Sequence, residues 1–342
     1  MDLSFDASTL SDRLSAFLTD RLCAPSRVVS LSQFSGGFSW LTYRFQLRIN
    51  AADHGGARQY ILRIGHPDGH LAPYSAAPEF LCFAAFRGSS VPVPLAYWHS
   101  DDTAIIGAPF LICDEVEGKA PAPWYFDQLD QTRIDNLSKE FVTHIANIHN
   151  FPWQDSPLRE ISNDVTRQSA TLSQIAQWEK RIDRTALQPF PVIRDAAIWL
   201  RRNCPAAPRL SIVHGDYRLG NFLEKDGKIT AVLDWELAHI GDPYEDLGWA
   251  CARIFTSDRN KVSNLGERRA FLNKYVRLTG LTPSEEILRY YEVMTIFKIV
   301  AINLGGIHNF YMRPGVNPKI GAVANQLPIH LRLLNKLVRD AS

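Results

Sequence analysis

Three polar residues, Asp216, Asn221 and Asp234, combine cation-binding side chains with a spacing that can bring them together. Asp216 and Asn221 lie in a polar loop after the apolar run 210–213, and Asp234 directly follows the apolar run 229–233. Two carboxylates and an amide oxygen suit a hard ion such as Mg²⁺, which shares its oxygen ligands with phosphates. In phosphoryl transfer, the metal gathers charge on the phosphate oxygens while a separate carboxylate orients the attacking hydroxyl. We therefore predict that Asp216 is the base or orienting group and that Asn221 and Asp234 are Mg²⁺ ligands.

A short strand, a loop and a hairpin are expected to position these residues. The hairpin spans 222–233 and turns at Asp226-Gly227, because Gly accepts the positive φ of a tight turn. This geometry would place the three polar residues at neighbouring strand ends. Arg218, in the loop, could reach a developing phosphate charge. His214 is grouped with the catalytic residues, where we expect it to brace the loop as a neutral ring rather than to act as an acid or base.

The pattern H-G-D-x-x-x-x-N at 214–221, followed after the hairpin by D-W-E at 234–236, resembles the aminoglycoside phosphotransferase/choline kinase family. The counterparts in the related protein kinases are H-R-D-x-x-x-x-N and D-F-G. Acids that merely cap surface turns are the alternative, but they would not share this order and spacing. The resemblance covers residues 35–310 and implies an α+β, bilobal protein-kinase-like fold. It implies an N-lobe at 1–115 with an antiparallel sheet and a helix, and a mainly helical C-lobe at 116–342 with the catalytic β-hairpin.

A glycine pair lies between two predicted strands, 28–34 and 40–49. Such a pair lets backbone N–H groups approach a phosphate closely, although Gly-Gly is also an ordinary turn. The segment is neither a Walker A loop nor G-x-G-x-x-G, but it resembles the nucleotide-covering loop of the family. The residues of this loop are Ser35, Gly36, Gly37, Phe38 and Ser39.

The third predicted strand, 60–64, carries Arg63 where kinase-like folds have a Lys that grips the nucleotide phosphates. Arg keeps the charge and can bind phosphate bidentately, although its fork geometry differs from that of Lys. Glu79, on the predicted helix 77–86, is the natural ionic partner of Arg63. The alternative is a solvated surface pair.

The predicted strand 109–113 leads into a glycine-containing connector, 114–118, which resembles the hinge between the two lobes. The resemblance implies that the peptide groups around Asp114 and Val116 hydrogen-bond adenine. It also implies that Cys113 lines the nucleotide pocket.

Two aspartates beyond the hairpin are expected to support the site. Asp242 is a good N-cap with Pro243 as the first helical residue, and Glu245 completes a capping-box-like arrangement. Asp246 resembles the family aspartate that braces the catalytic loop. Further helices are expected at 8–22, 131–149, 164–182, 190–203, 267–279, 283–307 and 318–338.

The composition indicates an ordinary soluble protein of 342 residues, with 46% hydrophobic residues, 21% charged residues and a net charge of +1. The sequence has no basic block, so neither a nucleic acid nor a membrane is indicated as a partner. The five cysteines lie far apart without C-x-x-C, which disfavours a disulfide framework or a zinc site. The N-terminus lacks the pattern of a signal peptide and no apolar run approaches about 18 residues, so we expect a cytoplasmic location.

Several segments resemble the phosphotransferase-like proteins found beside, or fused to, acyl-CoA dehydrogenases, a subgroup that also has Arg in the third strand. The segments are Tyr60-Ile61-Leu62-Arg63, His149 with Trp153, Arg167-Gln168 with Trp178, Arg277-Leu278-Thr279-Gly280 and Tyr290-Tyr291-Glu292. The resemblance implies Mg²⁺-dependent transfer from ATP, or GTP, to a hydroxyl of a small molecule, of which a hydroxylated acyl compound is one candidate.

Two other functions stay open from the sequence. A non-catalytic, pseudokinase-like nucleotide-binding regulatory module is supported by Arg63. A metal-dependent hydrolase would need clustered His ligands, whereas the ten His residues are scattered. The acceptor, the choice of ATP or GTP and the oligomeric state are left open.

Overall fold

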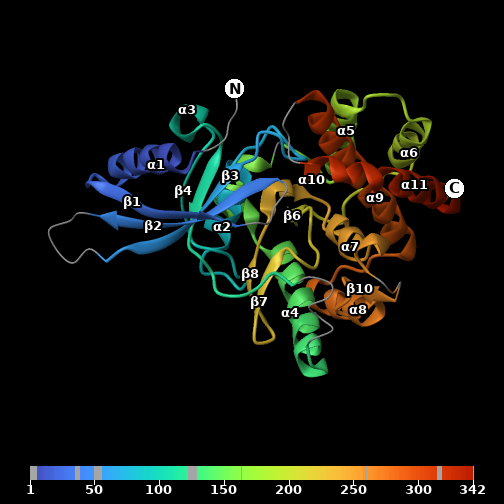
Figure 1. The fold of residues 1–342 in the computed structure, drawn as a ribbon. Helices are drawn as coiled ribbons and strands as arrows, with labels where there is room; N and C mark the ends of the chain where they lie inside the picture. Colours follow the sequence, from blue (N-terminus) through green and yellow to red (C-terminus); the bar gives the residue numbers. More distant parts are fainter. Residues whose placement is uncertain are drawn as a thin grey trace.

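The computed structural model describes residues 6–34, 39–49, 56–121, 129–162, 164–256, 258, 260–313 and 318–341. Figure 1 shows an N-terminal sheet beside a larger helical part that contains the C-terminus. The elements follow the predicted order, with most strands first and then mostly helices with a β-hairpin among them. The predicted α+β arrangement is therefore confirmed.

Five antiparallel strands form the N-terminal sheet in the order β1-β2-β3-β5-β4. Successive side chains on β5 point to opposite faces: Phe110 and Ile112 pack toward α1, whereas Leu111 and Cys113 join the core shared with α2. Arg63 on β3 is in register with Leu111, which places its side chain on the α2 face. The bounds are β1 (Ser26–Gln33), β2 (Trp40–Ile49), β3 (Arg58–Gly65), β4 (Ala96–Ser100), β5 (Phe110–Cys113), α1 (Ala7–Leu22), α2 (Ala77–Phe86) and the short α3 (Thr103–Ile106).

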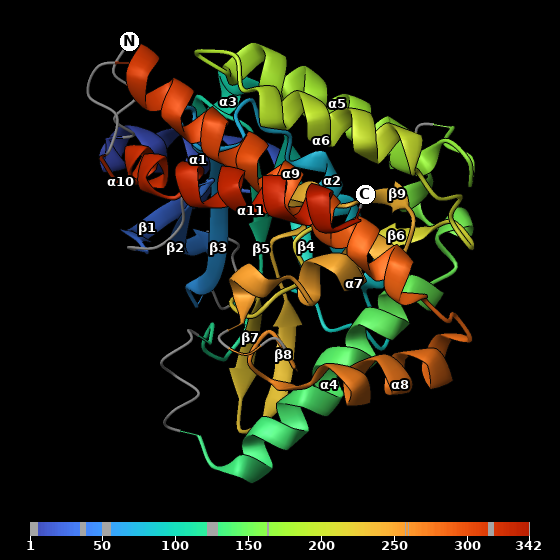
Figure 2. The ribbon, with the colours of Figure 1, turned by 90° about the vertical axis from the view of Figure 1, so that its right-hand side faces the viewer.

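Helix α9 lies at the centre of the helical part and packs against α5, α6, α7 and α11 (Figure 2). By length and composition it is the one described helix that could cross a membrane, yet 72% of its apolar window is buried inside the protein. It therefore serves as a core helix here. The bounds are α4 (Gln131–Asn150), α5 (Ala170–Thr185), α6 (Pro191–Arg202), α7 (Tyr244–Ala250), α8 (Arg268–Thr279), α9 (Glu285–Met312) and α11 (Leu327–Ala341).

Short ladders lie in the region of the predicted site. Strand β6 (Ser211–Val213) pairs with β9 (His239–Gly241), and β7 (Phe222–Lys225) pairs with β8 (Lys228–Val232). Asp226 and Gly227 join β7 to β8 with φ angles of 53° and 77°, the left-handed pair that a type I′ turn requires. The predicted hairpin is confirmed. A further small ladder pairs β10 (Lys261–Val262) with β11 (Gly266–Glu267).

The predicted single helix at 318–338 is wrong. The structure has α10 (Pro318–Gly321), a 3₁₀ turn (Ala322–Asn325) and a separate helix, α11. Pro328 lies in the first turn of α11, where its missing N–H costs no helical hydrogen bond. This proline therefore favours the start of a new helix at Leu327.

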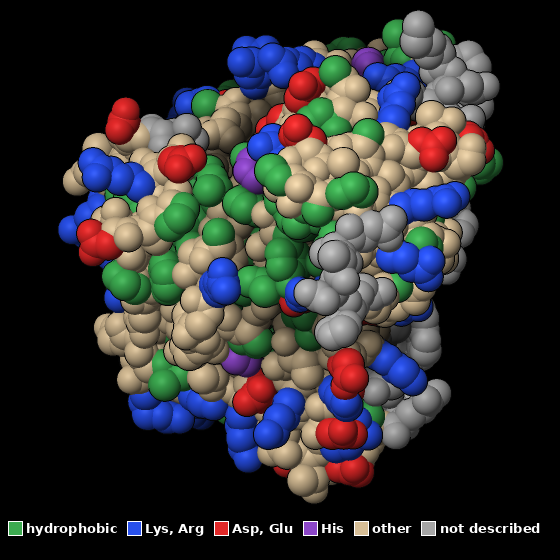
Figure 3. All heavy atoms as spheres, turned by 90° about the vertical axis from the view of Figure 1, so that its left-hand side faces the viewer, with side chains coloured by type: hydrophobic (Ala, Val, Ile, Leu, Met, Phe, Trp, Pro, Cys, Tyr) green, Lys and Arg blue, Asp and Glu red, His purple; other side chains and the backbone are tan. Residues whose placement is uncertain are grey.

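The face that carries β1 and β2 mixes side chains of both charges. Figure 3 shows acidic and basic side chains interspersed around its rim and hydrophobic side chains toward its middle. Among the described residues in this view, Lys and Arg form no broad tract. This distribution agrees with the net charge of +1.

Candidate active site

The loop that carries Asp216 begins where β6 ends, and buried Asp246 of α7 holds its backbone. The Asp246 carboxylate accepts hydrogen bonds from the N–H groups of His214 (2.7 Å) and Gly215 (2.8 Å). Gly215 has a φ of +84°, and a Cβ there would lie 2.6 Å from a carbonyl oxygen, so only glycine fits. Burial acts to raise the pKa of Asp246, but hydrogen bonds from His149 and the His214 backbone outweigh it and lower that pKa.

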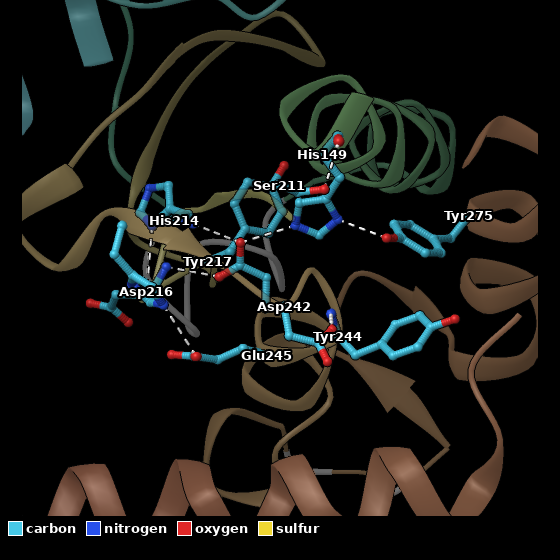
Figure 4. A network of polar contacts seen from close by, with 12 residues as sticks. His149, Ser211, His214, Asp216, Tyr217, Asp242, Tyr244, Glu245 and Tyr275 are labelled. Carbon is cyan, nitrogen blue, oxygen red and sulfur yellow. Dashed lines mark hydrogen bonds and ion pairs between the residues drawn. The ribbon is translucent and has the colours of Figure 1, made fainter. Parts of the chain in front are cut away.

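His149 of α4 and Tyr275 of α8 extend this support away from the loop (Figure 4). The His149 Nε2 atom lies 3.1 Å from Asp246 Oδ2, and its Nδ1 atom lies 2.7 Å from the Tyr275 hydroxyl. Burial lowers the pKa of His149, so the ring is neutral. Because Asp246 is ionised, Nε2 carries the proton and donates to it, and Nδ1 accepts from the Tyr275 hydroxyl.

Tyr275→Phe is expected to destabilise the protein by about 1–3 kcal/mol, because the buried His149 Nδ1 loses its donor. Urea unfolding of wild type and variant would measure the difference. Tyr311→Phe is the matched control, because Tyr311 is 74% exposed. Equal unfolding midpoints for Tyr275→Phe and the control would show that this hydroxyl adds nothing to the support.

His214 braces the loop, in the manner expected from the sequence. Its Nε2 donates to the Leu233 carbonyl (2.9 Å), and its Nδ1 accepts from the Asp216 N–H (3.2 Å). Burial lowers the pKa of the ring, which is therefore neutral. The Leu233 N–H in turn donates to the Asn221 carbonyl (2.9 Å). Leu233 thus ties the loop to the end of β8, next to Asp234.

The Asp216 carboxylate is held by three donors and remains 15% exposed. Oδ1 accepts from Trp249 Nε1 (2.6 Å) and Arg218 Nε (2.8 Å), and Oδ2 accepts from Asn221 Nδ2 (2.7 Å). Trp249, on α7, is a site residue that sequence reasoning missed. Its only signal was its place one helical turn after Asp246.

Asp234 lies beside the sequence-predicted Arg63–Glu79 pair. It has left-handed backbone angles (φ 68°, ψ 53°), and its Oδ1 accepts from Arg63 Nη2 at 2.8 Å. The other Arg63 nitrogen, Nη1, donates to Glu79 on α2. The Arg63 and Glu79 side chains are 13% and 0% exposed, so the solvated-pair alternative is wrong. Burial acts to raise the pKa of Asp234, and the Arg63 cation more than offsets this and lowers it.

The oxygen atoms of Asn221 and Asp234 fit a hard divalent cation. Asn221 donates through its amide nitrogen to Asp216, which leaves its Oδ1 for a cation. The Asp234 side chain is 31% exposed, and one of its oxygens is bonded to Arg63. Among the described residues, no group of three or more His, Cys, Asp or Glu side chains could hold a metal alone. The remaining ligands would therefore come from phosphates and water, as Mg²⁺ prefers.

Part of the predicted phosphate loop, Ser35, Gly36, Gly37 and Phe38, lies outside the described residues. Ser39 is described and half-buried. The next residue, Trp40, donates through Nε1 to Glu236 Oε2 at 2.9 Å, which links the sheet to the segment after β8. Glu236 is a second residue that sequence reasoning left unassigned, although it belongs to the D-W-E motif.

The predicted adenine edge lies where β5 ends. Cys113 is buried, and the Asp114 N–H donates to the Leu95 carbonyl at 2.9 Å. Within the described ranges, no residue donates to the Asp114 carbonyl or accepts from the Val116 N–H. One acceptor and one donor therefore remain for a ligand, which is the pair that the edge of a nucleobase requires.

Asp242 supports the start of α7, the helix that carries Asp246 and Trp249. Its Oδ1 accepts from the Tyr244 N–H at 2.9 Å, and burial raises its pKa to about 6. The predicted capping box is wrong, because the Glu245 side chain turns away to bind Lys298 at 2.6 Å. A buried cation attracts the carboxylate more strongly than a neutral backbone N–H.

Comparisons with known proteins agree with this arrangement. The model of the phosphotransferase enzyme family matches residues 30–281. Acyl-CoA dehydrogenase family member 10 of Mus musculus is 29% identical over 270 residues, covering 77% of this chain and 23% of that protein. Acyl-CoA dehydrogenase family member 11 of Pongo abelii is 25% identical over 323 residues, covering 90% of this chain and 40% of that protein. The chain thus spans less than half the length of these relatives.

Two solved structures are similar along nearly the whole chain. A candidate aminoglycoside phosphotransferase from Ralstonia eutropha has a TM-score of 0.73 at 21% identity, covering 97% of this chain and 98% of that chain. The aminoglycoside phosphotransferase APH(4)-Ia, as a thermostable mutant in complex with AMP-PNP and hygromycin B, has a TM-score of 0.62 at 18% identity, covering 96% and 99%. These likenesses show the kinase-like fold. Since the family model covers most of its length, this chain belongs to the phosphotransferase enzyme family.

Proposed function

We propose that this protein transfers the γ-phosphoryl group of ATP or GTP to a hydroxyl group of a small molecule. The observation that carries the proposal is the convergence of Asp216, Asn221 and Asp234, tied together by the backbone of Leu233. Family membership supports the reaction type, and one structural neighbour bound AMP-PNP together with hygromycin B.

Asp216 acts on the acceptor in this proposal. Its carboxylate is fixed by three donors and partly exposed, so it can accept the proton of an approaching hydroxyl. The acceptor oxygen forms a bond to the γ-phosphorus, and the bond from that phosphorus to the β,γ-bridging oxygen breaks. Arg218, which is ion-paired with Asp216, can stabilise negative charge on the transferring group.

Other residues of the site would hold the donor nucleotide. Asn221 and Asp234 would hold Mg²⁺, which when bound gathers charge on the phosphate oxygens. Arg63 would contact the phosphates while Glu79 orients its guanidinium group. The free peptide groups of Asp114 and Val116 would bind the base.

The acceptor that we favour is a hydroxylated acyl compound. The relatives named acyl-CoA dehydrogenase family members support this choice. The surroundings of Asp216 also support it: Trp249 donates to the carboxylate, and Arg218 lies over the Phe255 ring, 5.5 Å from its centroid. An aromatic and cationic wall suits an apolar or anionic acceptor better than a polycation such as an aminoglycoside.

Mg²⁺ with ATP or GTP is expected to raise the melting temperature by several degrees. A ligand at a hundred times its Kd stabilises the native state by about 2.7 kcal/mol, and each kcal/mol shifts a large domain by about 2–4 °C. A thermal-shift titration with ATP, GTP and ADP, with and without Mg²⁺, would measure this and select the nucleotide.

Asp234→Asn is the control for this titration. It is expected to remove the Mg²⁺-dependent part of the shift and to retain any metal-free binding of the nucleotide. If wild type showed no shift with any nucleotide, or an equal shift without Mg²⁺, the proposed metal and nucleotide site would be wrong.

The second candidate is a non-catalytic, nucleotide-binding regulatory module. The specific observation in its favour is that Arg63 engages Asp234, the proposed metal ligand, at 2.8 Å. The two candidates differ in turnover: the module would bind nucleotide without converting it, whereas the phosphotransferase would release ADP from ATP in a Mg²⁺-dependent manner.

A further inference from the structure

A buried lysine lies in the core next to the loop that carries Asp216. Lys298, on α9, is 1% exposed, and its Nζ lies 2.6 Å from Glu245 Oε1. A buried lone charge is strongly unfavourable, so this cation depends on its partner. The second Glu245 oxygen, Oε2, lies 3.3 Å from His239 Nε2. Burial acts to raise the pKa of Glu245, but Lys298 and His239 outweigh it and lower that pKa to about 2.

Two tryptophans enclose the same cation. The Lys298 Nζ atom lies 4.8 Å from the ring centroid of Trp249 on α7 and 5.3 Å from that of Trp178 on α5. Cation–π contacts of this length are attractive, and more so when they are desolvated. Lys298 Nζ also lies 3.4 Å from the carbonyl of Gly215, the residue before Asp216. One cation therefore contacts both the loop backbone and the ring beside Asp216.

Glu245 and Trp249 project from the same side of α7, because they lie four residues apart. Lys298 contacts both, while the Trp249 N–H donates to Asp216 Oδ1 at 2.6 Å. Figure 4 labels Glu245 and Asp216, which both belong to the polar network drawn there. The chain of contacts from α9 through α7 thus ends on the proposed base.

We propose that Trp249 is a positioning residue for Asp216 and that Lys298, with Glu245, sets the position of the Trp249 ring. This inference rests on the proposed function, since it assigns the residues that orient the reacting carboxylate. Together with the hydrogen bonds from Arg218 and Asn221, the hydrogen bond from the indole fixes the rotation of the Asp216 carboxylate about its side-chain bond. The nucleotide residues Arg63, Asp114 and Asp234 are not part of these contacts.

Trp249→Phe tests the first link, because it removes the N–H donor and keeps an aromatic ring on Lys298. The smaller ring also leaves a cavity in the core, and the control variant shares that change, since Trp249 and Trp178 are both buried. Steady-state turnover of Mg·ATP with water as the acceptor needs no identified substrate. We expect the turnover rate to fall about tenfold, the size of one hydrogen bond to a charged group. The KM for ATP is expected to stay within about twofold, because the nucleotide contacts are unchanged.

Trp178→Phe is the matched control, since Trp178 contacts the same Nζ atom and no hydrogen bond joins it to Asp216 among the described residues. Its turnover is expected to equal that of wild type. Equal turnover in Trp249→Phe, or a parallel loss in both variants, would overturn the positioning role.

The second link is tested by the double variant Lys298→Met/Glu245→Gln, which removes both buried charges and leaves neither uncompensated. We expect a fall in turnover similar to that of Trp249→Phe, with the KM for ATP retained. Wild-type turnover in a folded double variant would overturn the role of Lys298.

A spectroscopic readout separates this inference from the proposed function. In protein labelled at its eight tryptophan indoles, the N–H resonance that disappears in Trp249→Phe is expected to shift when Asp216 is changed to Asn. An unchanged resonance would overturn the contact. If the shift occurred while wild type showed no Mg²⁺-dependent turnover, the proposed function, and with it the positioning role, would fail although the contact stands.

Discussion

Asp216→Asn is expected to lower phosphoryl transfer by about 10²–10⁴-fold, the contribution of a positioned general base, while nucleotide binding survives. The new amide has nearly the same shape, so the donors Trp249 and Arg218 can still bond its oxygen. In the wild type, Asn221 Nδ2 donates to Asp216 Oδ2. In the variant, the new amide nitrogen would face Asn221 Nδ2, so this hydrogen bond would be lost. A stability loss of about 1–3 kcal/mol accompanies the change.

The measurement is ADP release from Mg·ATP, combined with calorimetric titration of the same nucleotide into the variant. Asp226→Asn is the matched control: this aspartate lies at the tip of the β7–β8 hairpin with its side chain 84% exposed, and Asn also tolerates its left-handed φ. Wild-type turnover in Asp216→Asn would show that the assigned base is wrong. A loss of nucleotide binding equal to the loss of turnover would show that Asp216 holds the nucleotide instead.

One part of the site that the sequence predicts is local in the chain. Asp216 and Asn221 are five residues apart, and the hairpin that returns the chain to Asp234 is marked by Asp226-Gly227. Short-range spacing and a turn whose φ angles favour Asn, Asp and Gly are enough to bring these groups to one place.

The parts that could not be predicted depend on contacts between distant elements. Trp249 and Lys298 contact the loop from two different helices, and Tyr275 supports it through His149 from a third. A residue type on a core helix carries no mark of which distant group its side chain will contact. Glu245 shows how a local rule fails. Its spacing from Asp242 is typical of a capping box, but Lys298, 53 residues further on, takes the carboxylate instead.

Arg63→Met is expected to lower the free energy of unfolding by about 3–5 kcal/mol, because removing one partner of a buried ion pair leaves the other uncompensated. Glu79 is fully buried, burial raises its pKa, and the Arg63 cation is what opposes that rise. Asp234 would lose its only described hydrogen-bond donor. Urea unfolding would measure the stability, and the Mg²⁺-dependent thermal shift with nucleotide would measure binding.

The double variant Arg63→Met/Glu79→Gln separates the two consequences. With Glu79 neutralised, no charge is left buried on α2, so most of the lost stability is expected to return, whereas nucleotide affinity is not, because no cation remains to contact the phosphates. Arg63→Lys keeps a positive charge, in the form that protein kinases use, but one ammonium group cannot place two nitrogens on Glu79 and Asp234 at once. Because Lys keeps a cation near the phosphates, we expect Arg63→Lys to bind nucleotide more strongly than either variant with Met at this position. Full nucleotide affinity in the double variant would show that Arg63 serves the fold alone and would favour a phosphate contact elsewhere in the site.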